Sequence, residues 1–92
     1  MGSYSKGVRL EYAARDVLIA RGYTVVRSAG SKGPVDLVAT CEKHILLIQV
    51  KAQGQVRPAD RAKLRVVPTP SRGVYREIWE RKNGAWSVTR LK

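Results

Sequence analysis

Apolar and polar positions recur with two different periods along the chain. In residues 5–21 apolar side chains return every three or four positions, which predicts an amphipathic helix that Gly22 ends. The positions concerned are Leu10, Ala13, Ala14, Val17 and Leu18. Residues 23–28 and 35–40 are rich in β-branched side chains, which predicts two short strands. Residues 44–52 are apolar at odd and even positions alike, as in a central strand buried on both faces.

The second half of the chain is irregular at first and then returns to strands. Pro58 opens a short predicted helix, and prolines further along the chain end it. Residues 74–80 and 86–90 are predicted strands joined around Asn83-Gly84, a pair typical of a tight hairpin turn. The predicted order is α-β-β-β-(α)-β-β. We therefore expect one α/β domain that spans all 92 residues.

Three polar residues fall where such a sheet is expected to have its core. Gln49 and Lys51 are two residues apart in the third strand, so their side chains share one face of the sheet. There they can converge on Asp36 from the neighbouring strand. Polar groups left without partners there cost about 1 to 3 kcal/mol each. A divalent metal ion with a phosphate would satisfy them, which predicts a metal-dependent nuclease. The ordinary alternatives are a carboxylate that caps a turn, a paired core amide and a surface lysine.

The charge of the chain indicates the class of partner. It has 18 Lys and Arg against seven Asp and Glu, a formal net charge of +11. The usual partner of such a chain is nucleic acid, and an anionic membrane surface is the weaker alternative. The longest unbroken apolar runs, such as residues 45–48, are too short to cross a bilayer, and no membrane partner is expected. The single cysteine, Cys41, cannot form an internal disulfide, and we expect a cytoplasmic protein.

Basic residues are concentrated between the third predicted strand and the C-terminal hairpin. This segment contains one acid, Asp60, and five residues that we expect to bind DNA phosphates and call the basic arm: Arg57, Arg61, Lys63, Arg65 and Arg72. A solvated face is the ordinary alternative. In the glycine-rich loop before Asp36, Ser31 would donate a hydrogen bond to phosphate and Lys32 would add a charge. Basic residues that would extend this track are Arg27, Arg76, Arg81, Lys82, Arg90 and Lys92.

Four segments within about residues 7–53 carry a resemblance to a known family. They are the helix KGVRLEYAARDVL, the strand end VVRS, the loop GSKGPVD and the strand LIQVKAQ. In this order they resemble the PD-(D/E)XK nuclease superfamily and, within it, the archaeal-type Holliday junction resolvases. The resemblance implies a single restriction-endonuclease-like domain, with a central mixed sheet flanked by helices.

The resemblance also implies an active site. By matching position, the catalytic residues would be Glu11, Ser31 (or Ser28), Asp36, Gln49 and Lys51. Two features depart from the family pattern. The proline stands two positions before Asp36 instead of next to it, and Gln49 replaces the usual glutamate. Glutamine in that place recurs among restriction-type relatives that recognise modified DNA.

Hydrolysis of a phosphodiester needs an activated water and positive charge near the phosphate. Mg²⁺ prefers oxygen ligands and keeps several waters, so a few protein ligands suffice. The candidate ligands are Glu11, Asp36, the Gln49 amide oxygen and the Val50 carbonyl. Mn²⁺ is an alternative ion, and no small-molecule cofactor is expected. Lys51 would orient or deprotonate the water or stabilise the transition state, and the sequence does not separate these roles.

We therefore expect a Mg²⁺-dependent endodeoxyribonuclease. The resemblance implies a Holliday junction resolvase that acts as a homodimer and nicks opposite strands of a four-way junction. One alternative is a modification-dependent or repair endonuclease of the same superfamily. Others are a non-catalytic nucleic-acid-binding module and a small ribosome-associated protein. For the dimer, Val8, Tyr12 and Ile19 cluster on the side of the first helix opposite its core stripe and would form a second packing surface.

Overall fold

The computed structural model describes residues 2–28 and 33–92, with the side chains of residues 2–5 left out. Its helices and strands follow one another in the predicted order. Their bounds are α1 (Gly2–Ala20), β1 (Thr24–Arg27), β2 (Leu37–Thr40), β3 (Ile45–Lys51), α2 (Pro58–Arg65), β4 (Val74–Lys82) and β5 (Ala85–Leu91). Neither helix of this described part is long and apolar enough to cross a membrane.

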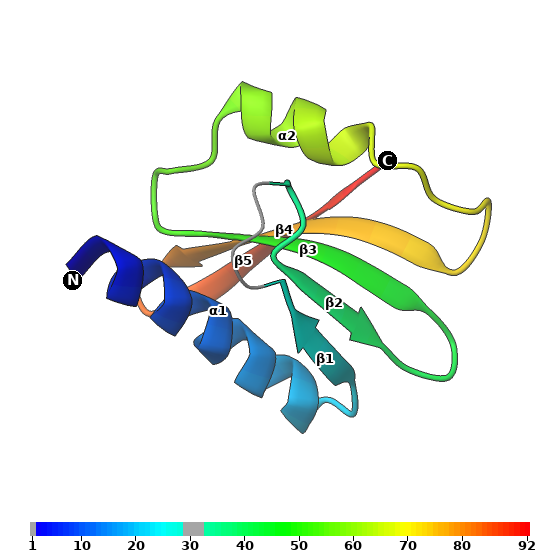
Figure 1. The fold of residues 1–92 in the computed structure, drawn as a ribbon, viewed down its shortest axis with the longest axis horizontal. Helices are drawn as coiled ribbons and strands as arrows, with labels where there is room; N and C mark the ends of the chain where they lie inside the picture. Colours follow the sequence, from blue (N-terminus) through cyan, green and yellow to red (C-terminus); the bar gives the residue numbers. More distant parts are fainter. Residues whose placement is uncertain (1, 29–32) are drawn as a thin grey trace.

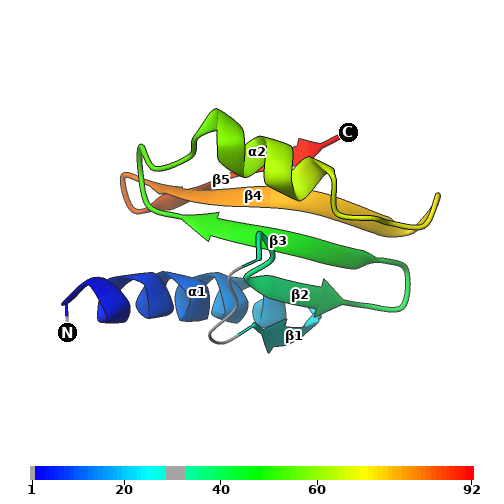
Figure 2. The same ribbon diagram turned by 45° about the horizontal axis from the view of Figure 1, so that its top comes forward.

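The strands form one mixed sheet in the order β1-β2-β3-β4-β5, which confirms the predicted fold class. β3 and β4 pair in parallel, and the other neighbours are antiparallel. A parallel pair needs a crossover connection, and α2 lies within it. α1 lies on one face of the sheet, along β1 to β3, and α2 lies on the opposite face, over β4 and β5 (Figures 1 and 2). The two faces are named here after these helices.

α1 closes its face of the sheet with the apolar stripe that the sequence predicts. Ala14 and Leu18 are fully buried, and Leu10 and Val17 pack on the same core. The chain turns away after the helix at Gly22, whose φ of 95° other residues rarely adopt. The strands contribute Leu37, Ala39, Leu46, Ile48, Val50 and Trp79 to this core.

α2 is shorter and covers less of its face. It begins with a proline, and the Asp60 carboxylate accepts a hydrogen bond from the Arg57 backbone N–H at 2.9 Å. This contact stabilises the first turn of the helix. Leu64 is buried against Ile78 of β4 and Leu91 of β5, which form a second, smaller core.

The β4–β5 hairpin turns at Asn83 and Gly84, as the sequence predicts. Both residues have a positive φ, 51° and 80°, which is the requirement of the tight turn that matches the twist of two strands. Trp79 and Trp86 pack diagonally across the hairpin with their ring centroids 5.7 Å apart. The hairpin is thereby fixed to the core under α1.

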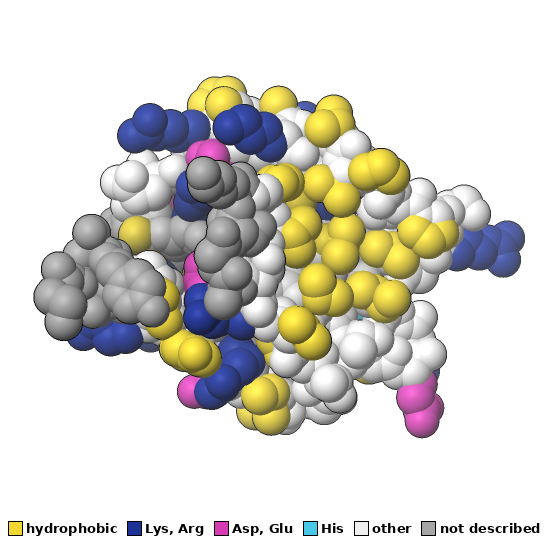
Figure 3. All heavy atoms as spheres, in the orientation of Figure 1, with side chains coloured by type: hydrophobic (Ala, Val, Ile, Leu, Met, Phe, Trp, Pro, Cys, Tyr) yellow, Lys and Arg dark blue, Asp and Glu magenta, His cyan; other side chains and the backbone are white. Residues whose placement is uncertain are grey.

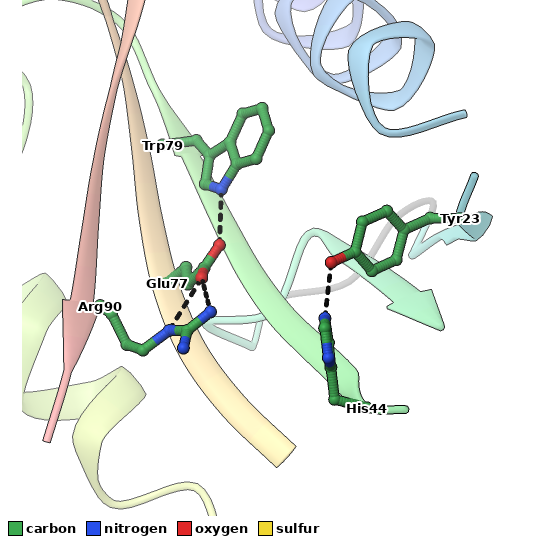
Figure 4. A network of polar contacts seen from close by, with 5 residues as sticks. All are labelled: Tyr23, His44, Glu77, Trp79 and Arg90. Carbon is green, nitrogen blue, oxygen red and sulfur yellow. Dashed lines mark hydrogen bonds and ion pairs between the residues drawn. The ribbon is translucent and has the colours of Figure 1, made fainter. Parts of the chain in front are cut away.

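Two polar contacts on the α1 face stabilise the sheet (Figure 4). The buried Glu77 carboxylate accepts hydrogen bonds from the Trp79 indole N–H and from the Arg90 guanidinium, so its charge is compensated. The ring of His44, just before β3, is hydrogen-bonded to the Tyr23 hydroxyl. Glu77 and His44 thus both have hydrogen-bond partners within the protein.

Part of the α2 face is not covered by the described chain. The register places Val26, Val38 and Leu47 side by side across β1, β2 and β3, and Ile45 is on the same face. Val26 is 63% exposed and Ile45 is 36% exposed. Figure 3 shows an apolar area on this side of the molecule. We call these four residues the open face.

Candidate active site

Asp36, Gln49 and Lys51 meet at the carboxyl end of β3. Leu37 lies opposite Ile48, and this register puts Asp36 beside Gln49 on the α2 face, which Lys51 shares. All three line a cavity of about 300 Å³. The structure thus brings together the residues that strand alternation predicts to converge. The other residues that line this cavity are Glu11, Gly33, Pro34, Val50, Asp60 and Lys63.

Asp36 is fixed by the backbone of the next strand. Its Oδ2 accepts a hydrogen bond from the Val50 N–H at 2.8 Å. Burial raises the pKa of its carboxyl, and the nearby charge of Glu11 adds to this, whereas the Val50 hydrogen bond and the Lys51 charge act in the opposite sense without cancelling it. A carboxylate in this position is stabilised by a further cation.

Gln49 supplies an oxygen with no partner of its own. The residue is 7% exposed, and its Oε1 atom is buried without a hydrogen-bond partner among the described residues. Buried polar atoms are nearly always satisfied, so this atom requires an explanation. Asp36 and Val50 line the same cavity, and the Asp36 carboxylate and the Val50 carbonyl would complete an all-oxygen donor set, which is the chemistry that Mg²⁺ and Mn²⁺ prefer. The residues present therefore fit a hard divalent cation.

Glu11, the other candidate ligand, lines the same cavity but has a protein partner. Its Oε1 is 2.9 Å from Nη1 of Arg27, the last residue of β1. No group of three or more His, Cys, Asp or Glu side chains in the described part of the chain is close enough to hold a metal. A cation here would depend on the Gln49 and Val50 oxygens and on water as well as on carboxylates.

Lys51 is paired with an acid that the sequence did not single out. Its Nζ is 3.4 Å from Oδ1 of Asp60, in the first turn of α2, and both side chains are half-buried. The position of Asp60 three residues after Arg57, at the start of a predicted helix, was a visible signal for a capping acid. Its proximity to Lys51 depends on how α2 crosses the sheet, which the sequence pattern does not give.

The basic residues divide into two groups. Arg57, Arg61, Lys63, Arg65 and Arg72 are exposed, as expected for residues that bind phosphate, and Lys63 also lines the cavity. By contrast, Arg27 pairs with Glu11, Arg90 pairs with Glu77, and Arg76 donates to the Val67 carbonyl. These three have structural roles. Ser31 and Lys32 lie outside the described residues.

A second, larger cavity of about 640 Å³ adjoins the first and shares Glu11, Val50 and Lys51 with it. It extends between the start of α1 and the β4–β5 hairpin, where Lys6 and Arg81 add positive charge. Lys51 therefore lies at the junction of two hollows. No sequence pattern predicts this larger cavity.

Comparison with known proteins identifies the family. The family model described as archaeal Holliday junction resolvase (Hjc) matches residues 2–65, which include every candidate catalytic residue. The chain belongs to this family. A comparison with curated proteins gave no match.

The fold is also similar to a solved structure of the family, the Hjc Holliday junction resolvase of the archaeal hyperthermophile Archaeoglobus fulgidus. The two are 25% identical with a TM-score of 0.63, and the match covers 90% of this chain and 70% of the other. The structural match covers more of the chain than the residues 2–65 that the family model matches. Membership in the Hjc family supports an endonuclease acting on branched DNA and disfavours a ribosome-associated protein.

Proposed function

We propose that this chain is a divalent-cation-dependent endonuclease that cleaves four-way DNA junctions, with Mg²⁺ as the ion and Mn²⁺ as a substitute. The observation that carries the proposal is the unpartnered, buried Gln49 Oε1 beside Asp36 and Lys51, in a member of the Hjc family. An oxygen donor, a carboxylate and a lysine at one cavity are the groups that phosphodiester hydrolysis requires.

Asp36, Gln49 and the Val50 carbonyl would hold the cation. When bound, it supplies Lewis acidity to the phosphate and lowers the pKa of a water ligand. Lys51 donates hydrogen bonds to the scissile phosphate and stabilises the charge that develops on it. Glu11 adds negative charge to the site, and Arg27 holds its carboxylate in place. A ligand role for Glu11 requires that Arg27 release one of its oxygens.

The exposed residues of the basic arm contact phosphates on either side of the cleaved bond. Arg57, Arg61 and Lys63 lie on or next to the first turns of α2, close to the cavity that Lys51 and Lys63 line. Their contacts are to the backbone and carry no sequence information. A protein with two such basic surfaces would distinguish a four-way junction from a linear duplex by the shape of the junction.

Paired nicks on opposite strands need two active sites, so the proposal includes a homodimer. We place its interface at the open face, because Val26, Ile45 and Leu47 expose neighbouring apolar surface that neither described helix covers. The surface predicted around Tyr12 is a less suitable interface, since the Tyr12 ring lies against the guanidinium groups of Arg15 and Arg27.

The test is incubation of the purified protein with a labelled four-way junction, a linear DNA duplex and an RNA duplex, each with and without Mg²⁺. Cleavage of the junction alone, dependent on Mg²⁺, supports the proposal. Binding without cleavage would indicate a non-catalytic module in which Gln49 reflects lost activity. Cleavage of the linear duplex, and only when it carries modified bases, would indicate a modification-dependent endonuclease.

A further inference from the structure

Asp60 has two different partners, one for each oxygen of its carboxylate. Oδ2 accepts the Arg57 backbone N–H at 2.9 Å, and Oδ1 lies 3.4 Å from the Lys51 Nζ. The exposed fractions of the Asp60 and Lys51 side chains are 19% and 27%, so the pair is mostly shielded from water. Both residues line the cavity that contains Asp36 and Gln49. Asp60 thus connects the start of α2 directly to the candidate catalytic lysine.

The charge on Asp60 is maintained by these contacts. Burial acts to raise the pKa of its carboxyl, but the Arg57 hydrogen bond and the Lys51 charge hold it below the usual range. These two contacts therefore favour the ionised form of the carboxylate. The contact that the structure shows for Oδ1 is with the Lys51 ammonium group.

We propose that Asp60 is a positioning residue that holds the Lys51 ammonium group at the mouth of the active site. The inference rests on the proposed nuclease function. A lysine side chain has a flexible four-carbon stem and places its charge poorly unless a partner fixes it. Asp60 is fixed in turn by the first turn of α2, which also carries Arg57 and Arg61. DNA phosphates bound by the arm and the lysine that acts on the scissile phosphate are then oriented by the same helix.

The test uses two substitutions that differ only in charge. Glutamate and glutamine both cap well at the third position of a helix, so Asp60→Glu and Asp60→Gln preserve the hydrogen bond to Arg57. Only Asp60→Gln removes the charge that faces Lys51. We expect it to lower the single-turnover rate on a four-way junction by about 10-fold to 100-fold, with the rate largely restored in Asp60→Glu. Junction affinity and the Mg²⁺ concentration for half-maximal rate should change less than about 2-fold in both.

A control variant and a titration that does not depend on activity distinguish the positioning role of Asp60 from the nuclease function. Asp16→Asn removes an exposed acid of α1 and should leave the cleavage rate unchanged. Independently of activity, the ¹³C carboxyl resonance of Asp60 should titrate at higher pH in Lys51→Met than in the wild type. Parental cleavage by Asp60→Gln, or an unchanged titration, would overturn the proposal. A wild-type protein that cleaves no junction, with the titration shift intact, would overturn the nuclease function and leave the pair as a structural contact.

Discussion

On one face of the sheet α1 runs along three strands and buries Ala14 and Leu18 in a continuous apolar core. On the other face the shorter α2 buries Leu64 against β4 and β5 and leaves β1 to β3 partly open. Asp36, Gln49, Lys51 and the open face lie on this second side, and Glu11 reaches the same cavity from α1. The comparison indicates that the α1 face supplies most of the stability, and that function is located where packing is incomplete.

The largest expected effect separates catalysis from binding on the α2 face. Lys51→Ala should lower the single-turnover cleavage rate by about 100-fold to 1000-fold, because the lost charge acts mainly on the transition state. Junction affinity should stay within a few-fold, since one charge among 18 Lys and Arg contributes little to polyanion binding. A mutant that cleaves at the parental rate would remove Lys51 from the site.

The second prediction concerns the two cores. Leu18→Ala should lower the free energy of unfolding by about 2 to 5 kcal/mol, because it leaves a cavity in the larger core. Cleavage measured well below the melting temperature should survive. Leu64→Ala should reduce stability and also slow cleavage, since α2 holds Asp60 and the basic arm. Denaturant titration and single-turnover assays on both mutants check this. An equal loss of activity in Leu18→Ala and Leu64→Ala would contradict the assignment of stability to the α1 face and of function to the α2 face.

Replacement of the basic arm should affect affinity more than rate. A triple mutant with glutamine in place of Arg57, Arg61 and Arg65 should bind DNA with a weaker dependence on salt. We expect the slope of log affinity against log salt concentration to decrease in magnitude by about 2 to 3, because each phosphate contact releases counterions. The loss should be similar for junction and duplex. Lys43→Gln, at the opposite end of β3, is the control and should leave the slope unchanged. If the triple mutant keeps the wild-type slope, these residues do not face DNA.

A matched pair of double mutants locates the dimer interface. Val26→Glu with Ile45→Glu should give a folded monomer that binds junctions more weakly and no longer makes paired nicks, because four carboxylates would repel one another across a two-fold axis. Tyr12→Glu with Ile19→Glu adds the same charge to α1 and should remain a dimer. Sedimentation distinguishes them. The reverse outcome would place the interface at α1, as the helical pattern predicts.

The smallest effect is a difference in pH dependence between two carboxylates. The pKa of the Asp36 carboxyl is higher in the folded chain than in the unfolded chain. Without a cation, the contribution of Asp36 to stability therefore falls as the pH rises from the unfolded-state pKa through the folded-state pKa. Asp36→Asn should therefore stabilise the cation-free fold at neutral pH. The lowered pKa of Asp60 has the opposite sign: its contribution is present at neutral pH and disappears as the pH falls through the folded value. Unfolding measured from pH 3 to 8 in Asp36→Asn and Asp60→Asn checks both signs.

Local signals in the sequence were enough to predict most of the fold. Gly22, Pro58 and Asn83-Gly84 each fix a boundary through the backbone conformation of one or two residues. Strand alternation was likewise enough to bring Gln49 to Asp36.

Contacts between distant elements were not predictable in this way. Arg27 meets Glu11, and Asp60 meets Lys51, only after α1 and α2 have docked on opposite faces. The third strand was predicted to be buried on both faces because it is apolar throughout. Its Ile45 is nevertheless 36% exposed, because a strand's composition does not reveal which chain covers it.

The crossover from β3 to β4 has a consequence for how activity arises during folding. The hairpin of β4 and β5 is built from neighbouring residues, whereas the parallel pair β3–β4 forms only after the whole segment of residues 52–73 has closed into a loop. Lys51 meets Asp60 in that same event. We therefore expect the candidate site to be assembled later in folding than the β4–β5 hairpin, when the crossover closes.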